Sequence, residues 1–338
     1  MINHSSPSIT ELEKRFVCNV LDSGLLTKGP NYKMFLGELE KFVSCKHCIL
    51  LSSGTSSLLA ILDTINKIDG LDKDEIILPT YVCKSVADAI TSSGFKPVFC
   101  DVGHNWVMNS KSVAEKITKK TKAIIIVNIF GIIVDCREFK KFDCLLIEDN
   151  CQSFYKSDSK FADFSFYSFH ATKCMTTAEG GLAVCHNNNY SDMFFNSSQN
   201  LEHTNGINEI NSALGLAQLE RYDEMLLKRN RIAAIYLEHI DCNLVSEIQK
   251  IDKTIYYRFP LRKKNNESFE SIKNEFEHNG VAVRKGVDML LHRLYGYGDK
   301  CFGVAKLLFD ETISIPIYPS LTLDEARYIS TLANRILV

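Results

Sequence analysis

Hydrophobic and polar positions alternate between two spacings along the first two thirds of this chain. Short apolar runs rich in β-branched residues are typical of buried strands, and they occur at residues 48–51, 75–78, 97–101, 122–128 and 144–148. Stretches with apolar residues at helical spacing occur near residues 10–21, 30–43, 56–68, 84–92 and 111–117. Because strands that alternate with helices are joined by crossover connections, the pattern predicts an α/β fold with a mainly parallel sheet covered by helices.

The pattern changes in the last third of the chain. Apolar runs at residues 164–170 and 181–185 are too close together for a crossover helix, so at least one of these strands is predicted to be antiparallel. One long helix is expected at 208–239, and strands at 254–261 and 281–287 flank an expected helix at 267–278. Thr322 and Glu325 have the spacing of a capping box. We therefore predict a large α/β domain at residues 1–239 and a smaller α+β domain at residues 240–338.

Composition narrows the class of protein. The 338 residues are 45% hydrophobic and 24% charged, with a formal net charge of −2. This balance is ordinary for a globular protein and offers no basic surface for nucleic acid or an anionic membrane. Neither a signal peptide nor an apolar run of about 18–20 residues, as a membrane-spanning helix needs, is evident. We expect a cytoplasmic protein.

The 12 cysteines are scattered and are expected to be free thiols. One pair, Cys45 and Cys48, has CxxC spacing, but a zinc site would need a second pair that the sequence lacks. A structural role is therefore favoured for this pair over a redox or metal role. No metal site is predicted.

A lysine and an acidic residue follow apolar strands in the middle of the chain. Asp149 ends the run that begins at Leu145, and Lys173 comes shortly after the strand that contains Tyr167. A lysine amine can form a Schiff base with the aldehyde of pyridoxal 5'-phosphate (PLP), and a carboxylate can keep the pyridine nitrogen of PLP protonated. Taken alone, Lys173 also fits an exposed lysine, and Asp149 also fits a helix N-cap.

Three further segments could serve the same cofactor. Gly54, Thr55 and Ser56 follow a strand and open a helix, where backbone N–H groups can bind a phosphate; the alternative is an ordinary Ser/Thr helix cap. Tyr81 follows a strand and could stack on a flat ring, although a buried core position fits it as well. Ser168 could add a hydrogen bond to the phosphate.

The order of these motifs is more specific than any one of them. It resembles the DegT/DnrJ/EryC1/StrS family of sugar aminotransferases, which are fold-type-I PLP enzymes. The matching segments are residues 20–24, 29–30, 53–56, 74–81, 97–101, 148–152, 168–173, 213–219 and 315–319. The resemblance thus covers nearly the whole chain.

The resemblance implies an aminotransferase that moves an amino group from glutamate to a nucleotide-linked keto sugar, expected to be a 4-keto-6-deoxyhexose, for amino sugars of a surface polysaccharide such as the lipopolysaccharide O-antigen. PLP would alternate with pyridoxamine 5'-phosphate (PMP). Lys173 would hold PLP covalently and move the proton, and Asp149 would pair with the pyridine nitrogen. Gln152 would hydrogen-bond the phenolic oxygen of the ring, and Tyr81 would stack on it. The residues implied at the phosphate are Gly54, Thr55, Ser168 and, more weakly, Ser56.

A homodimer with shared active sites is also implied. The family usually carries an Asn-x-Arg segment that reaches the site of the partner subunit, whereas this chain has Thr204 and Asn205 there and no arginine. Asn128 replaces a usual histidine, and the segments after Gln152 and Gly181 are shorter than usual. These departures leave open a smaller phosphorylated or cyclic ketone as the substrate.

Two other functions are less well supported. Family members that dehydrate keto sugars replace the lysine with histidine, but Lys173 stands in register and His170 lies earlier. A non-catalytic regulator with this fold would not need to keep Lys173, Asp149 and Gln152 together. The sequence therefore favours an aminotransferase.

Overall fold

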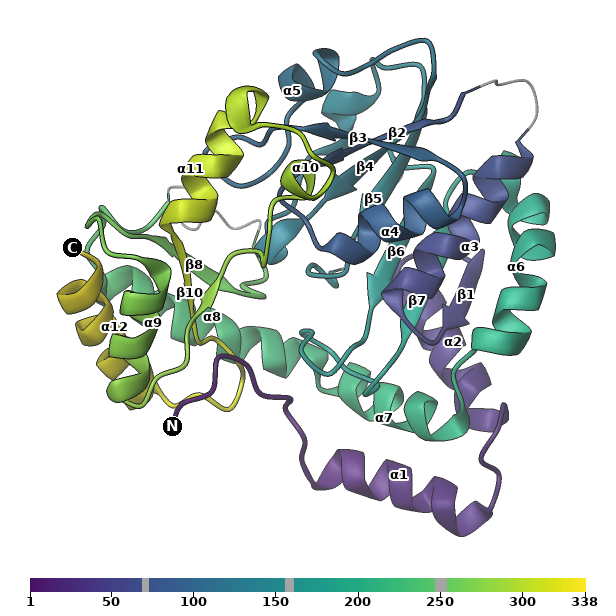
Figure 1. Ribbon diagram of the computed structural model, residues 1–338. Coiled ribbons are helices and arrows are strands. Elements are labelled where there is room, and N and C mark those ends of the chain that lie inside the picture. Colours follow the sequence, from purple (N-terminus) through teal and green to yellow (C-terminus); the bar gives the residue numbers. More distant parts are fainter. Residues whose placement is uncertain (69–72, 156–160, 247–253) are drawn as a thin grey trace.

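The computed structural model describes residues 1–68, 73–155, 161–246 and 254–338, which form two sheets flanked by helices (Figure 1). The strands of the larger sheet are β1 (Cys48–Leu51), β2 (Glu75–Pro79), β3 (Lys96–Cys100), β4 (Thr121–Val127), β5 (Leu145–Asp149), β6 (Phe164–Ser168) and β7 (Gly181–Cys185). Those of the smaller sheet are β8 (Phe259–Arg262), β9 (Arg284–Lys285) and β10 (Thr312–Ile315). The α-helices are α1 (Glu11–Ser23), α2 (Pro30–Phe42), α3 (Gly54–Lys67), α4 (Lys84–Ser92), α5 (Ser110–Ala114), α6 (Ser191–Asn205), α7 (Glu209–Glu220), α8 (Tyr222–His239), α9 (Phe269–His278), α10 (Leu291–Leu294), α11 (Gly303–Glu311) and α12 (Leu323–Leu337).

The larger sheet has the strand order β1-β7-β6-β5-β4-β2-β3. Its neighbouring strands are parallel from β3 to β6, and β7 runs antiparallel to both β6 and β1. The predictions of a mainly parallel sheet and of an antiparallel strand near residue 181 are thus confirmed. The short segment between β6 and β7 explains the change of direction, since it has no room for a crossover helix.

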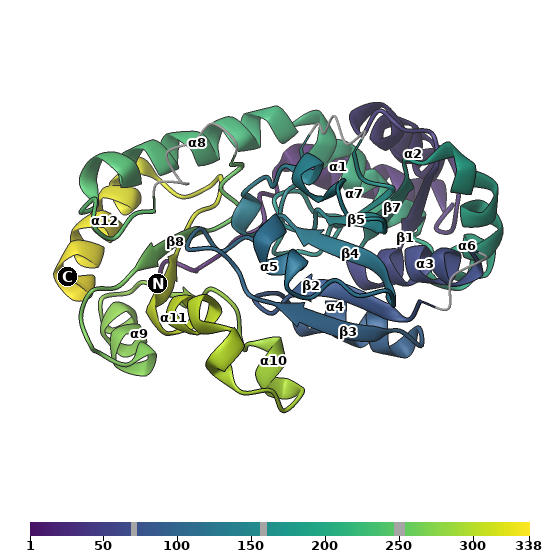
Figure 2. The ribbon, with the colours of Figure 1, turned by 90° about the horizontal axis from the view of Figure 1, so that it is seen from above.

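Both faces of this sheet are covered, which explains why its strands are continuous apolar runs. In β1, Ile49 and Leu51 pack into a cluster with α3 and α4, whereas Cys48 and Leu50 pack with α2 on the opposite face. The view along the sheet shows it as a central layer between helices (Figure 2). A strand buried on both faces needs apolar residues at every position.

The smaller sheet has the order β8-β10-β9, with both pairs antiparallel. Its core contains residues from β8 and β10, from α9 and α12, and from the second half of α8, such as Tyr236. Conversely, Leu291 and Leu308, which lie late in the sequence, pack into the core of the larger sheet. The division into domains after residue 239 stays a prediction, since each part of the chain contributes to the other core.

The expectation of one helix at residues 208–239 is wrong. The chain breaks between α7 and α8 at Arg221, whose side chain donates to the buried Glu13 on α1 over 2.6 Å. Gln218 Nε2 donates to the same carboxylate over 2.8 Å. These contacts between distant segments hold the break, and neither glycine nor proline marks it in the sequence.

Two expected strands are shorter than predicted. The segment expected at 254–261 forms a strand only from Phe259, because Thr254 and Ile255 instead pair with the chain at Gly131 and Ile132. Only Arg284 and Lys285 of the segment at 281–287 are in a strand. The capping box of Thr322 and Glu325 is confirmed at the start of α12. Among the described residues, every helix is too short or too polar to cross a lipid bilayer.

Candidate active site

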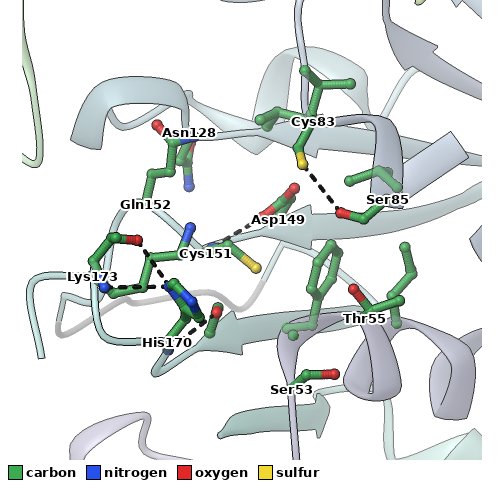
Figure 3. Close-up of a pocket in the computed structure, with 18 of the residues that line it drawn as sticks. Ser53, Thr55, Cys83, Ser85, Asn128, Asp149, Cys151, Gln152, His170 and Lys173 are labelled. Carbon is green, nitrogen blue, oxygen red and sulfur yellow. Dashed lines mark hydrogen bonds between the residues drawn. The ribbon is translucent and has the colours of Figure 1, made fainter. Parts of the chain in front are cut away.

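A cavity of about 350 Å³ opens where β4, β5 and β6 end and α3 begins (Figure 3). In open α/β sheets, ligands bind beyond the carboxyl ends of parallel strands. Six of the residues predicted from the sequence line this cavity, and they are Gly54, Thr55, Asp149, Gln152, Ser168 and Lys173. Residues from separate strands and loops are therefore brought to one place.

Asp149 is the last residue of β5 and is buried at the back of this cavity. Burial raises the pKa of Asp149, while hydrogen bonds from Cys151 and the charge of Lys173 oppose that rise. The backbone N–H of Cys151 donates to Oδ1 of Asp149 over 2.9 Å. A buried carboxylate is costly without a cation, so a protonated ring nitrogen would suit this position.

Lys173 lies in the turn after β6, where its backbone N–H donates to the carbonyl of His170 over 2.8 Å. Its Nζ lies 5.3 Å from the centre of the Tyr257 ring. Burial alone would lower the pKa of Lys173, but the neighbouring Tyr257, Cys151 and Asp149 together raise it. Burial would raise the pKa of Tyr257, yet Lys173 and Arg258 lower it. Lys173 and Tyr257 thus form an electrostatically coupled pair.

The start of α3 forms the floor of the cavity. Ser53 caps the helix by accepting from the backbone N–H of Ser56 over 3.0 Å, so the ordinary cap considered for this segment is present. A Cβ atom at Gly54 would lie only 2.9 Å from Cys151 Sγ and 2.9 Å from Ser168 Cβ. The first N–H groups of a helix have no acceptor within it and attract anions. The glycine therefore lets the cavity reach these N–H groups.

Not every predicted residue reaches the cavity. Ser56 points into the cap with Ser53 and does not line the cavity. Tyr81 is buried with 1% of its surface exposed, and its ring packs edge-on against Phe130. Tyr81 does not line the cavity in this structure, whereas Cys83 does, and the stacking of Tyr81 on a bound ring stays a prediction.

Thr204 and Asn205 also lie outside the cavity, at the end of α6. Thr204 Oγ1 donates to the carbonyl of Asn200 over 2.8 Å, and the carbonyl of Asn205 accepts from the backbone N–H of Ser52 over 2.6 Å. Their contact with a partner subunit stays a prediction.

Several cavity residues were not assigned a role from the sequence. Asn128 follows β4, and its Nδ2 donates to Glu148 over 3.0 Å and to Asn150 over 2.6 Å. His170 and Glu179 line the cavity and lie 3.6 Å apart. The signal for Asn128 was a polar residue directly after an apolar strand, but nothing in the sequence indicated that Glu179 faces His170.

Comparisons with known proteins agree with this geometry. The model of the DegT/DnrJ/EryC1/StrS aminotransferase family matches residues 7–332. The chain is 28% identical to GDP-perosamine synthase of Escherichia coli O157:H7 over 97% of this chain and 96% of that protein. It is 29% identical to UDP-4-amino-4,6-dideoxy-N-acetyl-beta-L-altrosamine transaminase of Helicobacter pylori over 69% of this chain and 68% of that protein.

Solved structures show the same fold. Protein Spr1654 from Streptococcus pneumoniae, in its PMP form, superposes with a TM-score of 0.88 at 25% identity, over 99% of this chain and 98% of that one. Helicobacter pylori PseC superposes with a TM-score of 0.90 at 23% identity, over 99% and 98% of the two chains.

The fold and the site therefore define a PLP-dependent aminotransferase. The chain belongs to the DegT/DnrJ/EryC1/StrS aminotransferase family. The residues present fit this cofactor, because the cavity combines a lysine amine, a buried carboxylate with a raised pKa and a helix start freed by Gly54.

Proposed function

We propose that this chain transfers an amino group from glutamate to a nucleotide-linked keto sugar, specifically a 4-keto-6-deoxyhexose, in the synthesis of amino sugars for a surface glycan such as the O-antigen of lipopolysaccharide. The observation that carries the proposal is the presence of Lys173 and Asp149 in one cavity. The names of the relatives support the substrate class, since they refer to a perosamine synthase and an altrosamine transaminase. The family supports the reaction type.

Lys173 is the catalytic acid and base of this proposal. Its amine would hold the cofactor, and the cofactor would supply an electron sink for the carbon that gains or loses the amino group. The amine of Lys173 would take a proton from that carbon in one half-reaction and return one in the other. Tyr257 and Asp149 act on the charge of this amine, so they help to set the pH range in which it works.

Asp149 and Gln152 orient the ring in this proposal. Asp149 would face the ring nitrogen, and its own position is held by the backbone N–H of Cys151. Gln152 Oε1 accepts from the backbone N–H of Phe130 over 2.7 Å, which leaves its Nε2 to donate to the phenolic oxygen of the ring. A fixed carboxylate and a fixed amide would prevent the ring from tilting.

The phosphate of the cofactor is assigned to the start of α3. Gly54 and Thr55 would supply backbone N–H groups, and the hydroxyl groups of Thr55 and Ser168 would add donors. Ser56 contributes through the cap, since it holds Ser53 in place. The stacking of Tyr81 on the ring stays a prediction, since Tyr81 is buried against Phe130 in this structure.

The chain is proposed to act as a homodimer in the cytoplasm. Thr204 and Asn205 end α6, and the carbonyl of Asn205 already contacts Ser52, next to the assigned phosphate site. This position makes the end of α6 the candidate for contact with the active site of the partner subunit. Sedimentation of the purified chain tests the dimer directly.

The test of the proposed activity begins with the covalent bond. Treating the cofactor-loaded protein with borohydride should fix the cofactor on the peptide that contains Lys173, and Lys173→Ala should abolish both this label and amine transfer, by about 10³-fold or more. Glutamate should then be assayed with nucleotide-linked 4-keto sugars and with simple keto phosphates. Labelling at another lysine overturns the site, and transfer only to keto phosphates overturns the substrate class.

A further inference from the structure

Helix α2 connects to the edge strand β1 (Figure 1), and cysteine and histidine side chains lie at this connection, outside the cavity. The CxxC pair lies in this connection: Cys45 is in the loop and Cys48 is the first residue of β1. Cys185, at the end of β7, and His186 lie beside them. Among the described residues, no group of such side chains is arranged to hold a metal ion, so this cluster calls for another explanation.

The thiol of Cys48 contacts the backbone of Cys45. Cys48 Sγ donates to the carbonyl of Cys45 over 3.3 Å, which closes the turn between them. The two thiol groups also affect the pKa of each other. Cys45 Sγ lies 3.2 Å from the carbonyl of Cys185, which holds it at the end of the sheet. Both sulfur atoms therefore lie at the same end of the sheet, with Cys48 Sγ against the backbone of Cys45.

The two cysteines differ in access. Cys48 is buried with 3% of its surface exposed, whereas Cys45 is partly exposed. A hydrogen bond from Cys48 lowers the pKa of Cys45 to about 4 with help from His186, although burial opposes the change. The pKa of Cys48 is raised by the same hydrogen bond and by burial. An accessible thiolate beside a buried thiol is the arrangement of an attacking and a resolving cysteine.

The surrounding groups support Cys45 as the attacking thiol. Ser165 Oγ lies 2.8 Å from His186 Nε2 and so fixes the imidazole near Cys45. Lys46 and His47 are the intervening residues of the motif. Glu40 opposes them, because its carboxylate lies close enough for Cys45 to raise the pKa of Glu40. His186 lowers the pKa of Cys45, which favours its thiolate.

We propose that Cys45 and Cys48 are a dithiol pair that low-molecular-weight disulfides convert reversibly into an intramolecular disulfide. The thiolate of Cys45 attacks one sulfur of the reagent, forms a mixed disulfide and releases one thiolate. The thiol of Cys48 then loses its proton and attacks the sulfur of Cys45, which releases the second thiolate. Two protein thiols are oxidised, one reagent disulfide is reduced to two thiols, and the two protons go to those thiols.

This modification is expected to leave the cavity intact. Cys48 begins β1, whereas the phosphate segment at Gly54 follows the other end of the strand. The disulfide would close only the turn before β1. The proposal is therefore independent of the proposed enzymatic function, and cofactor retention is expected to be equal in the reduced and oxidised protein.

The test uses the full chain with its cofactor and oxidised glutathione as the reagent. After blocking of the remaining thiols and digestion, the peptide with both cysteines should have lost the mass of two hydrogen atoms, and a reducing thiol should reverse this loss. Cys45 should react about tenfold or more faster than the exposed Cys18. The proposal is overturned if Cys45 and Cys48 are still free thiols after treatment with oxidised glutathione, or if Cys18 reacts before Cys45.

Serine variants distinguish the attacking cysteine from the resolving cysteine. In Cys48→Ser, a mixed disulfide with glutathione should accumulate at Cys45, because the resolving thiol is gone. In Cys45→Ser, Cys48 should stay unmodified, and Cys18→Ser should change neither result. A mixed disulfide that persists at Cys45 in the unaltered chain would show that Cys48 does not resolve it. Cofactor absorption confirms that each variant is folded.

Discussion

The larger and the smaller sheet differ in how their strands are built. The strands of the larger sheet are covered on both faces, and β4 is buried along its whole length. In the smaller sheet, β9 has only two residues, and one of them, Arg284, is exposed. The larger sheet carries the cavity at its strand ends, whereas the smaller sheet is a support that packs through α8. A site that must hold several groups at fixed positions is thus built on the more completely buried sheet.

The largest loss of stability should come from a substitution in the core of the smaller sheet. Ile315 is fully buried in β10, so Ile315→Ala should lower the free energy of unfolding by about 3 kcal/mol. If the smaller sheet only supports the site, cofactor affinity should change little in native buffer. Denaturant unfolding followed by circular dichroism and by cofactor absorption measures both quantities.

The matched variant is Ile125→Ala in the larger sheet, where Ile125 is equally buried. It should cost about as much stability but should also weaken cofactor binding, because β4 carries one side of the cavity. If both variants lose cofactor affinity equally, the smaller sheet does more than support the sheet that carries the cavity.

A smaller effect is expected at the floor of the cavity. Gly54→Ala places a methyl group 2.9 Å from Cys151 Sγ and 2.9 Å from Ser168 Cβ, so the cofactor should bind about 30-fold more weakly. Equilibrium dialysis of PLP measures this change. Gly37→Ala, within α2 and with open space around it, is the control and should leave binding unchanged. Unaltered binding in Gly54→Ala would remove Gly54 from the phosphate site.

The smallest change in stability is expected at Glu13, which contacts Arg221 between α7 and α8. Burial alone would raise the pKa of Glu13, but hydrogen bonds from Thr10 and Arg221 lower it by more. The pKa of Glu13 is therefore below its usual value. The stability that this carboxylate adds is therefore complete above its unfolded pKa and is lost as the pH falls through its folded pKa. Glu13→Gln should cost about 1 kcal/mol at neutral pH and should weaken the dependence of stability on acid pH.

Urea unfolding at several acidic pH values measures this dependence. Glu11→Gln is the control, since Glu11 forms an exposed pair with Lys14 and should have almost no effect. An unchanged acid profile in Glu13→Gln would mean that the carboxylate of Glu13 does not add the stability assigned to it.

The strands of the larger sheet could be predicted because complete burial leaves an unmistakable apolar run. The break at Arg221 could not, since the spacing of apolar residues continues through it and its cause is Glu13, far away in the sequence. Strand β9 could not be bounded for a similar reason: its two residues pair with β10, but their side chains are not an apolar run.

In the candidate site, too, some positions could be predicted from the sequence and others could not. Lys173 and Asp149 both follow apolar strands, and because strand ends meet at one edge of a parallel sheet, the sequence could predict that they lie together. Their roles are implied by the resemblance to the family. Tyr81 and Cys83 differ by only two positions in the sequence, yet one packs against Phe130 and the other lines the cavity. Side-chain direction after a strand depends on the packing of the loop, which local pattern does not describe.

The sequence by itself determined the class of fold and the order of the strands in the chain, because these depend on burial and on local spacing, and the order of its motifs indicated the family. The tertiary structure alone decided where α7 ends, that Cys83 lines the cavity and that the thiol of Cys48 contacts the backbone of Cys45. Those features depend on contacts between residues that are distant in the sequence, and the energies of such contacts are not encoded in any single segment.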